Sequence, residues 1–246
     1  MRTIVINPTY THLREWLEQL PTTFDHTGEI IYSARNQIRV MSTPDGRQVC
    51  VKRFHKPLFP NRLFYTFCRP PKAKRAYDNS LELLHRGIGT PEPVAYLLEF
   101  PCGLLGFSYL VTLQSSLHRN FYEFQNGDIS GKEDILQAFA RYTAHAHEQG
   151  VYHLDYSPGN ILFDQKDGEW KFEMIDINRL QFKPSISIRQ GSRNFARLWG
   201  KEDLHRTIAQ AYAEARNGSP DDCIREALRA REQFWRHRRH SFFVYD

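Results

Sequence analysis

The sequence predicts an α+β fold in two parts: an antiparallel sheet with one main helix over residues 1–114, and a mostly helical part over residues 115–246. Three observations predict this division. Short apolar runs bounded by turn residues, typical of strands, occur between residues 29 and 54 and again between 90 and 114. Apolar residues recur at helical spacing between residues 135 and 146 and between 204 and 235. The strands and most of the helices therefore occupy separate halves, as in α+β proteins.

Composition limits the class of protein. A chain of 246 residues with 41% hydrophobic residues is long enough to bury a sizeable core. No apolar run approaches the roughly 20 residues that a membrane span needs, and the first residues lack the features of a signal peptide. Four scattered cysteines without a C-x-x-C pattern indicate free thiols rather than disulfides or a zinc site. We therefore expect a cytoplasmic protein.

In the first part, residues 1–6 predict a short strand, and a packing helix follows that carries Leu13 to Leu20 and stops at Pro21. Strands are expected over residues 30–32, 37–41 and 48–54. The aromatic, basic and proline-rich residues 55–71 indicate a mobile or partner-facing segment. A helix over residues 73–85, stopped by Gly87, and strands over 90–98 and 107–114 complete a five-stranded lobe.

In the second part, Ser130 and Glu133 predict a capping box for a long helix that ends at Gly150. A helix-like stretch follows over residues 194–199, and another helix carries the apolar positions 204, 208 and 212. Ser219 and Pro220 open a last helix. Its inward positions are expected to be Ile224, Leu228 and Trp235.

The stretch after the long helix carries the chemistry. His153, Asp155 and Asn160 fit the pattern H-x-D-x-x-x-x-N, and Asp176 closes an apolar strand. Between them, residues 161–163 and 172–175 predict a hairpin whose turn is Asp167-Gly168. This is the layout of a kinase catalytic loop followed by its metal-binding Asp, so it predicts a protein-kinase-like bilobal fold. A solvated loop would explain the H-x-D alone, but the full combination rarely arises by chance.

Each residue type in this stretch suits a step of phosphoryl transfer. A carboxylate, Asp155, would align the acceptor hydroxyl and take its proton, with His153 as the second catalytic residue of the loop. Mg²⁺ prefers oxygen ligands and keeps several waters, so an amide oxygen from Asn160 and a carboxylate from Asp176 would suffice to hold it.

The nucleotide side is less complete. Lys52, late in the strand over 48–54, is the residue expected against the phosphates of ATP, although an exposed Lys on an edge strand would look the same. The preceding turn contains Arg35 and Asn36 as candidate phosphate contacts but no glycine. A kinase helix normally supplies a Glu to this Lys, and the expected place falls near Ala76. Glu82 and Asp78 are therefore the candidates, with Glu82 ahead of Asp78.

Seven segments together carry a family resemblance. They are Tyr32-x-x-Arg35-Asn36, Val51-Lys52-Arg53-Phe54, Lys72 to Tyr77, Gly87 to Pro93, Tyr109-Leu110-Val111, His153-Leu154-Asp155 through Asn160, and Ile175 to Arg179. With them the chain resembles the bacterial lipopolysaccharide kinases, which phosphorylate Kdo or heptose sugars of the lipid A inner core. The resemblance implies ATP and Mg²⁺ as cofactors, with Lys52 on ATP, Asp155 as base, and Asn160 and Asp176 on the metal. Ser157 departs from the Lys of protein Ser/Thr kinases.

The charge bears on the acceptor. The formal net charge of +5 indicates an anionic partner. Two groups of arginines would suit phosphate or carboxylate recognition if they lie on helices. One is spaced by four, Arg189, Arg193 and Arg197, and the other falls in a short final segment: Arg225, Arg229, Arg231, Arg236, Arg238 and Arg239. A lipopolysaccharide precursor and the anionic cytoplasmic face of the inner membrane both fit such a surface, whereas a solvated face with salt bridges to Glu226 and Glu232 is the alternative. RNA binding is a weaker alternative, because no stacking or groove-reading motif accompanies the charge.

Two other classes of function remain open. One is a phosphotransferase of the same fold that acts on a different small molecule or on protein Ser/Thr. The other is a pseudokinase that binds nucleotide without transferring phosphate. Intact Asp155, Asn160 and Asp176 argue against the pseudokinase, whereas the loop without glycine and the uncertain helix Glu argue for it.

Overall fold

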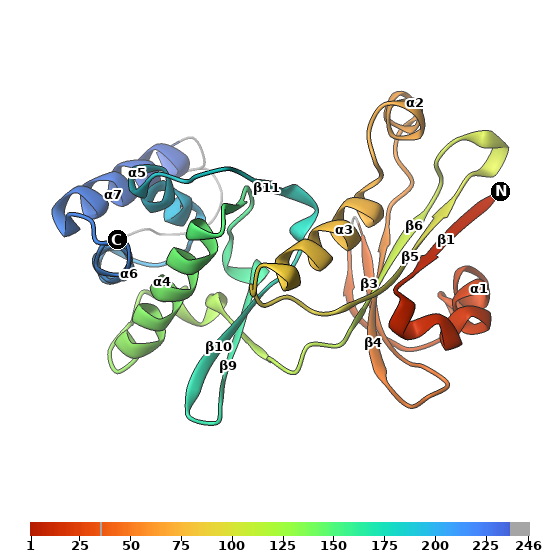
Figure 1. The fold of residues 1–246 in the computed structure, drawn as a ribbon, viewed down its shortest axis with the longest axis horizontal. Helices are drawn as coiled ribbons and strands as arrows, with labels where there is room; N and C mark the ends of the chain where they lie inside the picture. Colours follow the sequence, from red (N-terminus) through yellow and green to blue (C-terminus); the bar gives the residue numbers. More distant parts are fainter. Residues whose placement is uncertain (35, 237–246) are drawn as a thin grey trace. The chain divides into compact units, whose positions relative to one another are not determined.

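We describe a computed structural model of the chain, in which residues 1–34 and 36–236 are described. The chain divides into two compact units, Met1–Ser116 and a second that begins at Leu117. The first unit runs from red to green in Figure 1, and the second from green to blue. Each unit is considered by itself.

The first unit is built on one six-stranded antiparallel sheet with the order β1-β5-β6-β4-β3-β2. Its strands are β1 (Arg2–Ile6), β2 (Glu29–Ser33), β3 (Gln37–Ser42), β4 (Gln48–Phe54), β5 (Pro93–Glu99) and β6 (Ser108–Leu113). The five strands expected from residue 29 onward are present. The short strand predicted at the N-terminus joins the same sheet beside β5, so the sheet has six strands.

Helices cover both faces of this sheet. On one face, a 3₁₀ turn, η1 (Pro8–Leu13), and α1 (Arg14–Thr23) pack against Val49, Val51 and Leu97 of the sheet. On the other face, α3 (Lys72–His85) packs against Phe54, Tyr96 and Leu98. Because alternate side chains of a strand point to opposite faces, β5 is apolar along nearly its whole length. The two faces matter for the site because the alternation along β4 determines on which face of the sheet the Lys52 side chain lies.

The end of α1 differs from the prediction. The helix does not stop at Pro21 but continues to Thr23 with Pro21 inside it. Proline lacks an N–H, so the carbonyl of Leu17 loses its helical donor. Leu17, Leu20 and Phe24 are all fully buried against the sheet. Their burial stabilises the helix by more than the one lost hydrogen bond costs.

Residues 55–71, for which no helix was predicted, contain α2 (Phe59–Phe67), which opens with Pro60 in its first turn. The following helix, α3, ends as predicted. Gly87 has a φ of 70°. The Ile88 N–H donates to the Leu83 carbonyl (2.9 Å) and the Gly87 N–H to the Leu84 carbonyl (3.0 Å), which is a Schellman motif.

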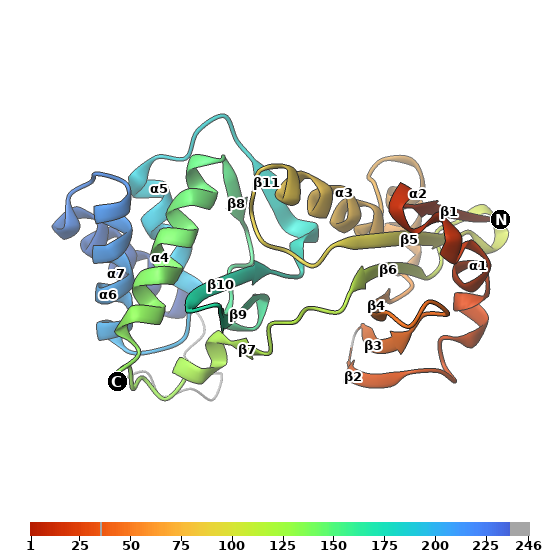
Figure 2. The same ribbon diagram turned by 60° about the horizontal axis from the view of Figure 1, so that its bottom comes forward.

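The second unit is mostly helical, with α4 (Glu133–Glu148), α5 (Ile188–Ser192), α6 (Glu202–Ala215) and α7 (Pro220–Arg236). Short strands complete it: β7 (Arg119–Asn120), β8 (Val151–His153), β9 (Ile161–Lys166), β10 (Glu169–Met174) and β11 (Leu180–Phe182). A cluster of aromatic rings forms its core, including Phe121, Phe139 and Phe163. Figure 2 shows the β9–β10 hairpin beside α4, with α6 and α7 beyond that helix.

The predicted hairpin is present. Asp167 and Gly168 form its turn with φ angles of 52° and 79°. Met174 pairs with Ile161 at the other end. The next hydrogen bond, from the Ile175 N–H to the Asn160 carbonyl (3.0 Å), brings the chain before Asp176 against Asn160. The hairpin therefore joins the two predicted metal ligands at one end.

Two details of the helices differ from the prediction. Ser130 does not cap α4: the N-cap is Lys132, and Gly131, with a φ of 70°, separates Ser130 from the helix. In α7 the buried residues are Cys223, Glu226 and Ala227, whereas the predicted inward residues Ile224, Leu228 and Trp235 are only half-buried. The first error concerns the residue at which α4 begins, and the second concerns which face of α7 is buried. Both helices were themselves predicted.

Within residues 1–34 and 36–236, no helix combines the length and the apolar character that a membrane crossing requires.

Candidate active site

His153 fixes the start of the catalytic loop. It ends β8, and its side chain is 1% exposed. Its Nδ1 accepts a hydrogen bond from the Asp155 N–H (3.0 Å), so Nε2 carries the proton that it donates to the Ile175 carbonyl (3.2 Å). Burial lowers the pKa of His153, which keeps the ring neutral. The ring thus ties the backbone at Asp155 to the residue before Asp176.

Asn160 is held by its amide nitrogen. Nδ2 donates to the Asp155 carbonyl (2.9 Å) and to Oγ of Ser157 (3.1 Å). These two bonds use both amide hydrogens, so the orientation of the amide is fixed and Oδ1 is the atom left to act as a ligand. A primary amide held in this way presents one oxygen to a cation.

Asp176 follows β10 in a left-handed conformation, with φ 52° and ψ 42°. This region is sparsely populated by residues other than glycine, and such residues gather at functional sites. The carboxylate accepts a hydrogen bond from Nδ2 of Asn178 (2.7 Å). The turn therefore presents the Asp176 carboxylate with one of its oxygens already held by Asn178.

The donor set can be compared with the needs of metals. Over the described part of the chain, no three His, Cys, Asp or Glu side chains lie close enough together to hold a metal ion. Asn160 and Asp176 offer one amide oxygen and one carboxylate. This is a poor set for zinc, but it fits Mg²⁺, which is bound through one or two protein oxygens with phosphate oxygens and water completing the shell.

Asp155 itself is paired with Arg197. The distance from Nη1 of Arg197 to Oδ1 of Asp155 is 2.5 Å, and the two side chains are 32% and 30% exposed. The guanidinium of Arg197 also lies 5.0 Å from the ring centroid of Phe234 on α7. In the sequence Arg197 is visible only as part of an arginine run, and no spacing indicates Asp155 as its partner.

The arginine run does not act as one anion-binding face. Arg189 and Arg193 both donate to the buried carboxylate of Glu226, at 3.0 and 2.7 Å, whereas Arg197 turns to Asp155. The hydrogen bond from Arg193 lowers the pKa of Glu226. In the last helix, Arg225 pairs with Asp222 and Arg236 with Glu232. The salt-bridged alternative therefore describes these residues, while Arg238 and Arg239 lie outside the described part.

A chain of hydrogen bonds in the interior of the second unit holds the start of the catalytic loop. Arg216 donates to the hydroxyl of Tyr212 (2.8 Å), and that hydroxyl donates to Nδ1 of His147 (2.9 Å). Nε2 of His147 donates to Oδ1 of Asn194 (3.1 Å), whose Nδ2 donates to the His153 carbonyl (2.9 Å). Burial lowers the pKa of His147 to about 4, so the ring stays neutral in this chain. Neither His147 nor Asn194 belongs to a sequence motif that would have indicated this role.

In the first unit, Lys52 lies on β4. Val49 and Val51 point to the α1 face, so Lys52 shares the α3 face with Phe54, and its Nζ lies 5.3 Å from the Phe54 ring centroid. The two helix candidates are engaged elsewhere. Asp78 pairs with Lys74 (2.8 Å) in α3, and Glu82 pairs with Arg86 (2.6 Å), the residue that follows the helix.

The expected position of the helix Glu is on the buried side of α3, where Ala76 packs at 2% exposure. In the loop before β3, Oδ1 of Asn36 accepts from the His55 N–H (3.3 Å), so this side chain braces the loop against the end of β4. Arg35 lies outside the described residues. The structure thus joins four predicted residues in the second unit, whereas Asp78 and Glu82 each pair with a basic residue one turn away.

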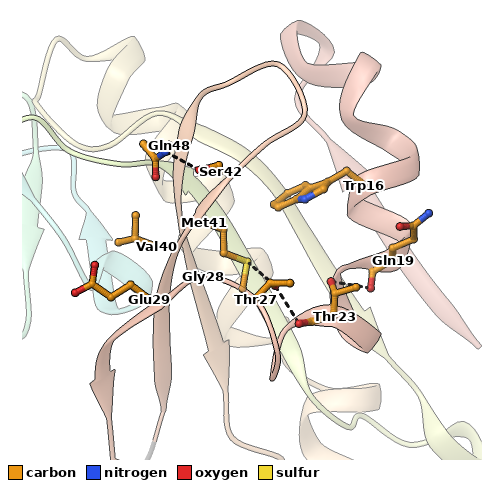
Figure 3. Close-up of a pocket in the computed structure, with 10 residues that line it drawn as sticks. All are labelled: Trp16, Gln19, Thr23, Thr27, Gly28, Glu29, Val40, Met41, Ser42 and Gln48. Atoms are coloured by element: carbon orange, nitrogen blue, oxygen red, sulfur yellow. Dashed lines mark hydrogen bonds between the residues drawn. The ribbon is translucent and has the colours of Figure 1, made fainter.

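A shallow pocket of about 580 Å³ lies in the first unit between α1 and the β2–β3 edge (Figure 3). Trp16 and Gln19 line it from α1, and Met41 and Ser42 line it from β3. It contains none of the predicted site residues. Its polar groups are partly used among themselves, as in the bond from Gln48 to Ser42 (2.7 Å), so we assign no chemistry to it.

Comparison with known proteins gives one family and several related folds. Residues 28–215 match the lipopolysaccharide kinase (Kdo/WaaP) family model. Among solved structures, WaaP in complex with acyl carrier protein has a TM-score of 0.61 at 16% identity, covering 96% of this chain and 97% of the other. The chain matches no curated protein.

Two further structures have lower TM-scores. The Rio2 kinase–ADP/Mg²⁺–phosphoaspartate complex from Chaetomium thermophilum has a TM-score of 0.48 at 14% identity, covering 94% of this chain and 77% of the other. The Mycobacterium tuberculosis PknI kinase domain has a TM-score of 0.44 at 13% identity, covering 83% and 93%. The predicted α+β, protein-kinase-like fold and the predicted family are both confirmed.

Proposed function

The chain belongs to the lipopolysaccharide kinase (Kdo/WaaP) family, and from this membership we propose that it transfers the γ-phosphate of ATP to a hydroxyl of a Kdo or heptose sugar in the lipopolysaccharide inner core. The observation that carries the proposal is the second-unit loop, where the Asp155 carboxylate is held by Arg197 and the Asn160 amide by hydrogen bonds within the loop. Such fixed positioning of a few groups is how kinases accelerate phosphoryl transfer.

Asp155 is the residue that we assign to the acceptor. Its Oδ1 is taken by Arg197, which leaves Oδ2 to accept a hydrogen bond from the sugar hydroxyl. In the transfer, the hydroxyl oxygen forms a bond to the γ-phosphorus, the bond from that phosphorus to the bridging oxygen breaks, and ADP leaves. The proton of the hydroxyl passes to the Asp155 carboxylate.

Arg197 and His153 have different roles beside Asp155. Arg197 places a cation beside Asp155, and in protein Ser/Thr kinases a lysine of the loop occupies the position of Ser157 here. We therefore propose that Arg197 stabilises the negative charge that develops on the transferred phosphoryl group. His153 is buried and bonded to backbone through both nitrogens, so we assign it a positioning role rather than contact with substrate.

The remaining roles concern nucleotide and metal. Asn160 and Asp176 would hold Mg²⁺, which supplies neutralisation of the phosphate charge when it is bound. Lys52 would pair with the α- and β-phosphates from the first unit. Asp78 and Glu82 keep their basic partners one turn away, so we assign neither to ATP.

The acceptor belongs to a lipid, so we propose that the protein works in peripheral contact with the anionic cytoplasmic face of the inner membrane. A pseudokinase is the second candidate. The observation that favours it is the nucleotide side of the first unit, where the loop before β3 has no glycine and Ala76 stands where a helix Glu is expected.

The test is to incubate the purified protein with Mg²⁺, labelled ATP and Kdo-lipid A beside the variants Asp155→Asn and Asp167→Asn. Asp167 lies in the exposed hairpin turn and serves as a matched control. We expect label on the lipid, a loss of roughly 10²–10⁴ in rate for Asp155→Asn, and an unchanged rate for Asp167→Asn. ATP consumption without labelled lipid would refute the acceptor, and absence of both would favour the pseudokinase.

A further inference from the structure

We propose that α2 and the basic residues at its two ends form a docking surface for an anionic lipid bilayer. In Figure 1, α2 stands away from the sheet of the first unit, at the end of two connecting segments. None of its nine residues is buried. A helix of a soluble protein normally hides one face, so the orientation of this helix needs an explanation.

The polar side of α2 is the one that holds it to the protein. Nε of Arg62 donates to the Leu105 carbonyl (2.9 Å), and Oγ1 of Thr66 accepts from the Leu105 N–H (3.0 Å). Tyr65, on the same side, packs against the cluster beneath α3. The helix is therefore inverted, with its hydrogen-bonding groups turned inward.

The apolar side is exposed. Phe59, Leu63 and Phe67 lie four residues apart, so they follow one another along one face, with Phe64 at its edge and Leu58 just before the helix. Phe59 and Phe67 are 65% and 74% exposed. A continuous apolar face of this kind on a soluble unit marks a site of interaction.

The charge around this face selects the partner. Residues 55–71, which contain α2 and its connections, include three Lys and Arg and no Asp or Glu. Lys56 precedes α2 and Arg69 follows it, and both are exposed. Apolar side chains flanked by cations are the pattern of a helix that lies in the interface of an anionic bilayer. The inward turn of Arg62 and Thr66 removes polar contacts from the face, which favours lipid over a soluble protein partner.

The test measures binding of the full-length protein to sedimented vesicles of phosphatidylcholine with and without phosphatidylglycerol. The variant is Phe59→Ser combined with Phe67→Ser. The matched control is Leu81→Ser combined with Leu84→Ser, because these leucines of α3 are also exposed, at 42% and 40%. We expect binding only to anionic vesicles, a loss of at least tenfold in the variant, and less than a twofold change in the control.

Several results would overturn the proposal. They are binding by the variant equal to that of the unchanged protein, equal binding to neutral vesicles, or a protein that is dimeric until the two phenylalanines are replaced. A tryptophan at position 67, as Phe67→Trp, gives a second readout, because its emission should shift to the blue on anionic vesicles if the face enters the interface. An unshifted emission would also overturn the proposal.

This inference deepens the peripheral membrane contact of the proposed function but does not require the transfer reaction. Transfer to detergent-dispersed acceptor should be unchanged in the Phe59→Ser/Phe67→Ser variant. If the variant loses vesicle binding but keeps transfer, the docking surface is supported. If the unchanged protein binds vesicles but transfers no phosphate, the docking surface stands and the proposed kinase activity is refuted. The two proposals therefore fail separately.

Discussion

The catalytic side and the nucleotide side of the predicted site differ in how the chain holds their residues. In the second unit, Asp155 and Asn160 have fixed partners within the loop, and His153 and Asn194 tie the loop to more distant segments. In the first unit, the two acidic candidates pair with basic residues one turn away. The groups that we assign to the acceptor and the metal are thus held by buried hydrogen bonds, whereas the two acidic candidates of α3 are held by ion pairs at the surface.

The physical difference lies in burial. His147 and His153 are 2% and 1% exposed, so each of their hydrogen bonds must be made or a buried polar group is left unsatisfied. Asp78 and Glu82 sit at the surface, where an ion pair contributes little and water replaces a lost partner. Substitutions should therefore have large effects in the second unit and small effects on α3.

After the loss expected for Asp155→Asn, the largest effect is expected for Arg197→Ala. Removing the guanidinium frees the Asp155 carboxylate to rotate and removes a cation from the developing charge, so kcat should fall about 10²-fold with little change in the KM for ATP. Arg197→Lys keeps the charge and should recover part of the loss. Steady-state kinetics of lipid phosphorylation provide the measurement.

Arg193→Ala is the control for this prediction. Arg193 lies one turn from Arg197 but bonds to Glu226, which keeps its bond to Arg189 in the variant. Its kcat should stay within about twofold of the unchanged protein. Equal losses in both variants would indicate a general structural defect and would contradict the role of Arg197.

The next effect concerns stability in acid. His147 has a pKa of about 4 in the folded protein against 6.5 for an ordinary histidine, because it is buried against Tyr212 and Asn194 near Arg216. Between these values the unfolded state binds the extra proton, so stability is complete above pH 6.5 and falls as the pH approaches 4. The full loss from this one group would be about 3 kcal/mol.

Urea unfolding at a series of pH values measures this loss. In His147→Gln the acid slope should be shallower, although the variant will be less stable overall because the hydrogen-bond chain is altered. His145→Gln is the control, since His145 is exposed on the same helix and its loss should leave the slope unchanged. An identical slope in all three proteins would rule out His147 as its source.

The features that could be predicted from the sequence are those whose backbone geometry depends on neighbouring residues. The Asp167-Gly168 turn, the Gly87 helix end and the catalytic loop are all local patterns with a defined backbone geometry. The resemblance to lipopolysaccharide kinases rested on such local segments, and the family match confirmed it. The helix α2 was missed because Pro57, Pro60 and Pro70 crowd a segment that forms only one short helix.

Hydrogen bonds between residues that are far apart in the chain could not be predicted from the sequence. Arg197 and Asp155 are 42 residues apart, and Asn194 and the His153 carbonyl are 41 apart, so no spacing rule connects them. The extension of α1 through Pro21 has a similar origin, since the burial of Leu17 and Phe24 outweighs a local signal. Tertiary packing decided each of these features, and packing is not visible in a run of neighbouring residues.

The smallest effect is expected for Asp78→Asn combined with Glu82→Gln, which removes both acidic candidates from α3. Each carboxylate already pairs with a basic residue one turn away and is partly exposed, so loss of these pairs should destabilise the protein by less than about 1 kcal/mol. If neither residue serves Lys52, the KM for ATP should change by less than about threefold, while Lys52→Ala should raise it far more. A double variant as defective as Lys52→Ala would show that a carboxylate of α3 reaches the nucleotide when ATP binds. The two sides of the site would then be maintained equally.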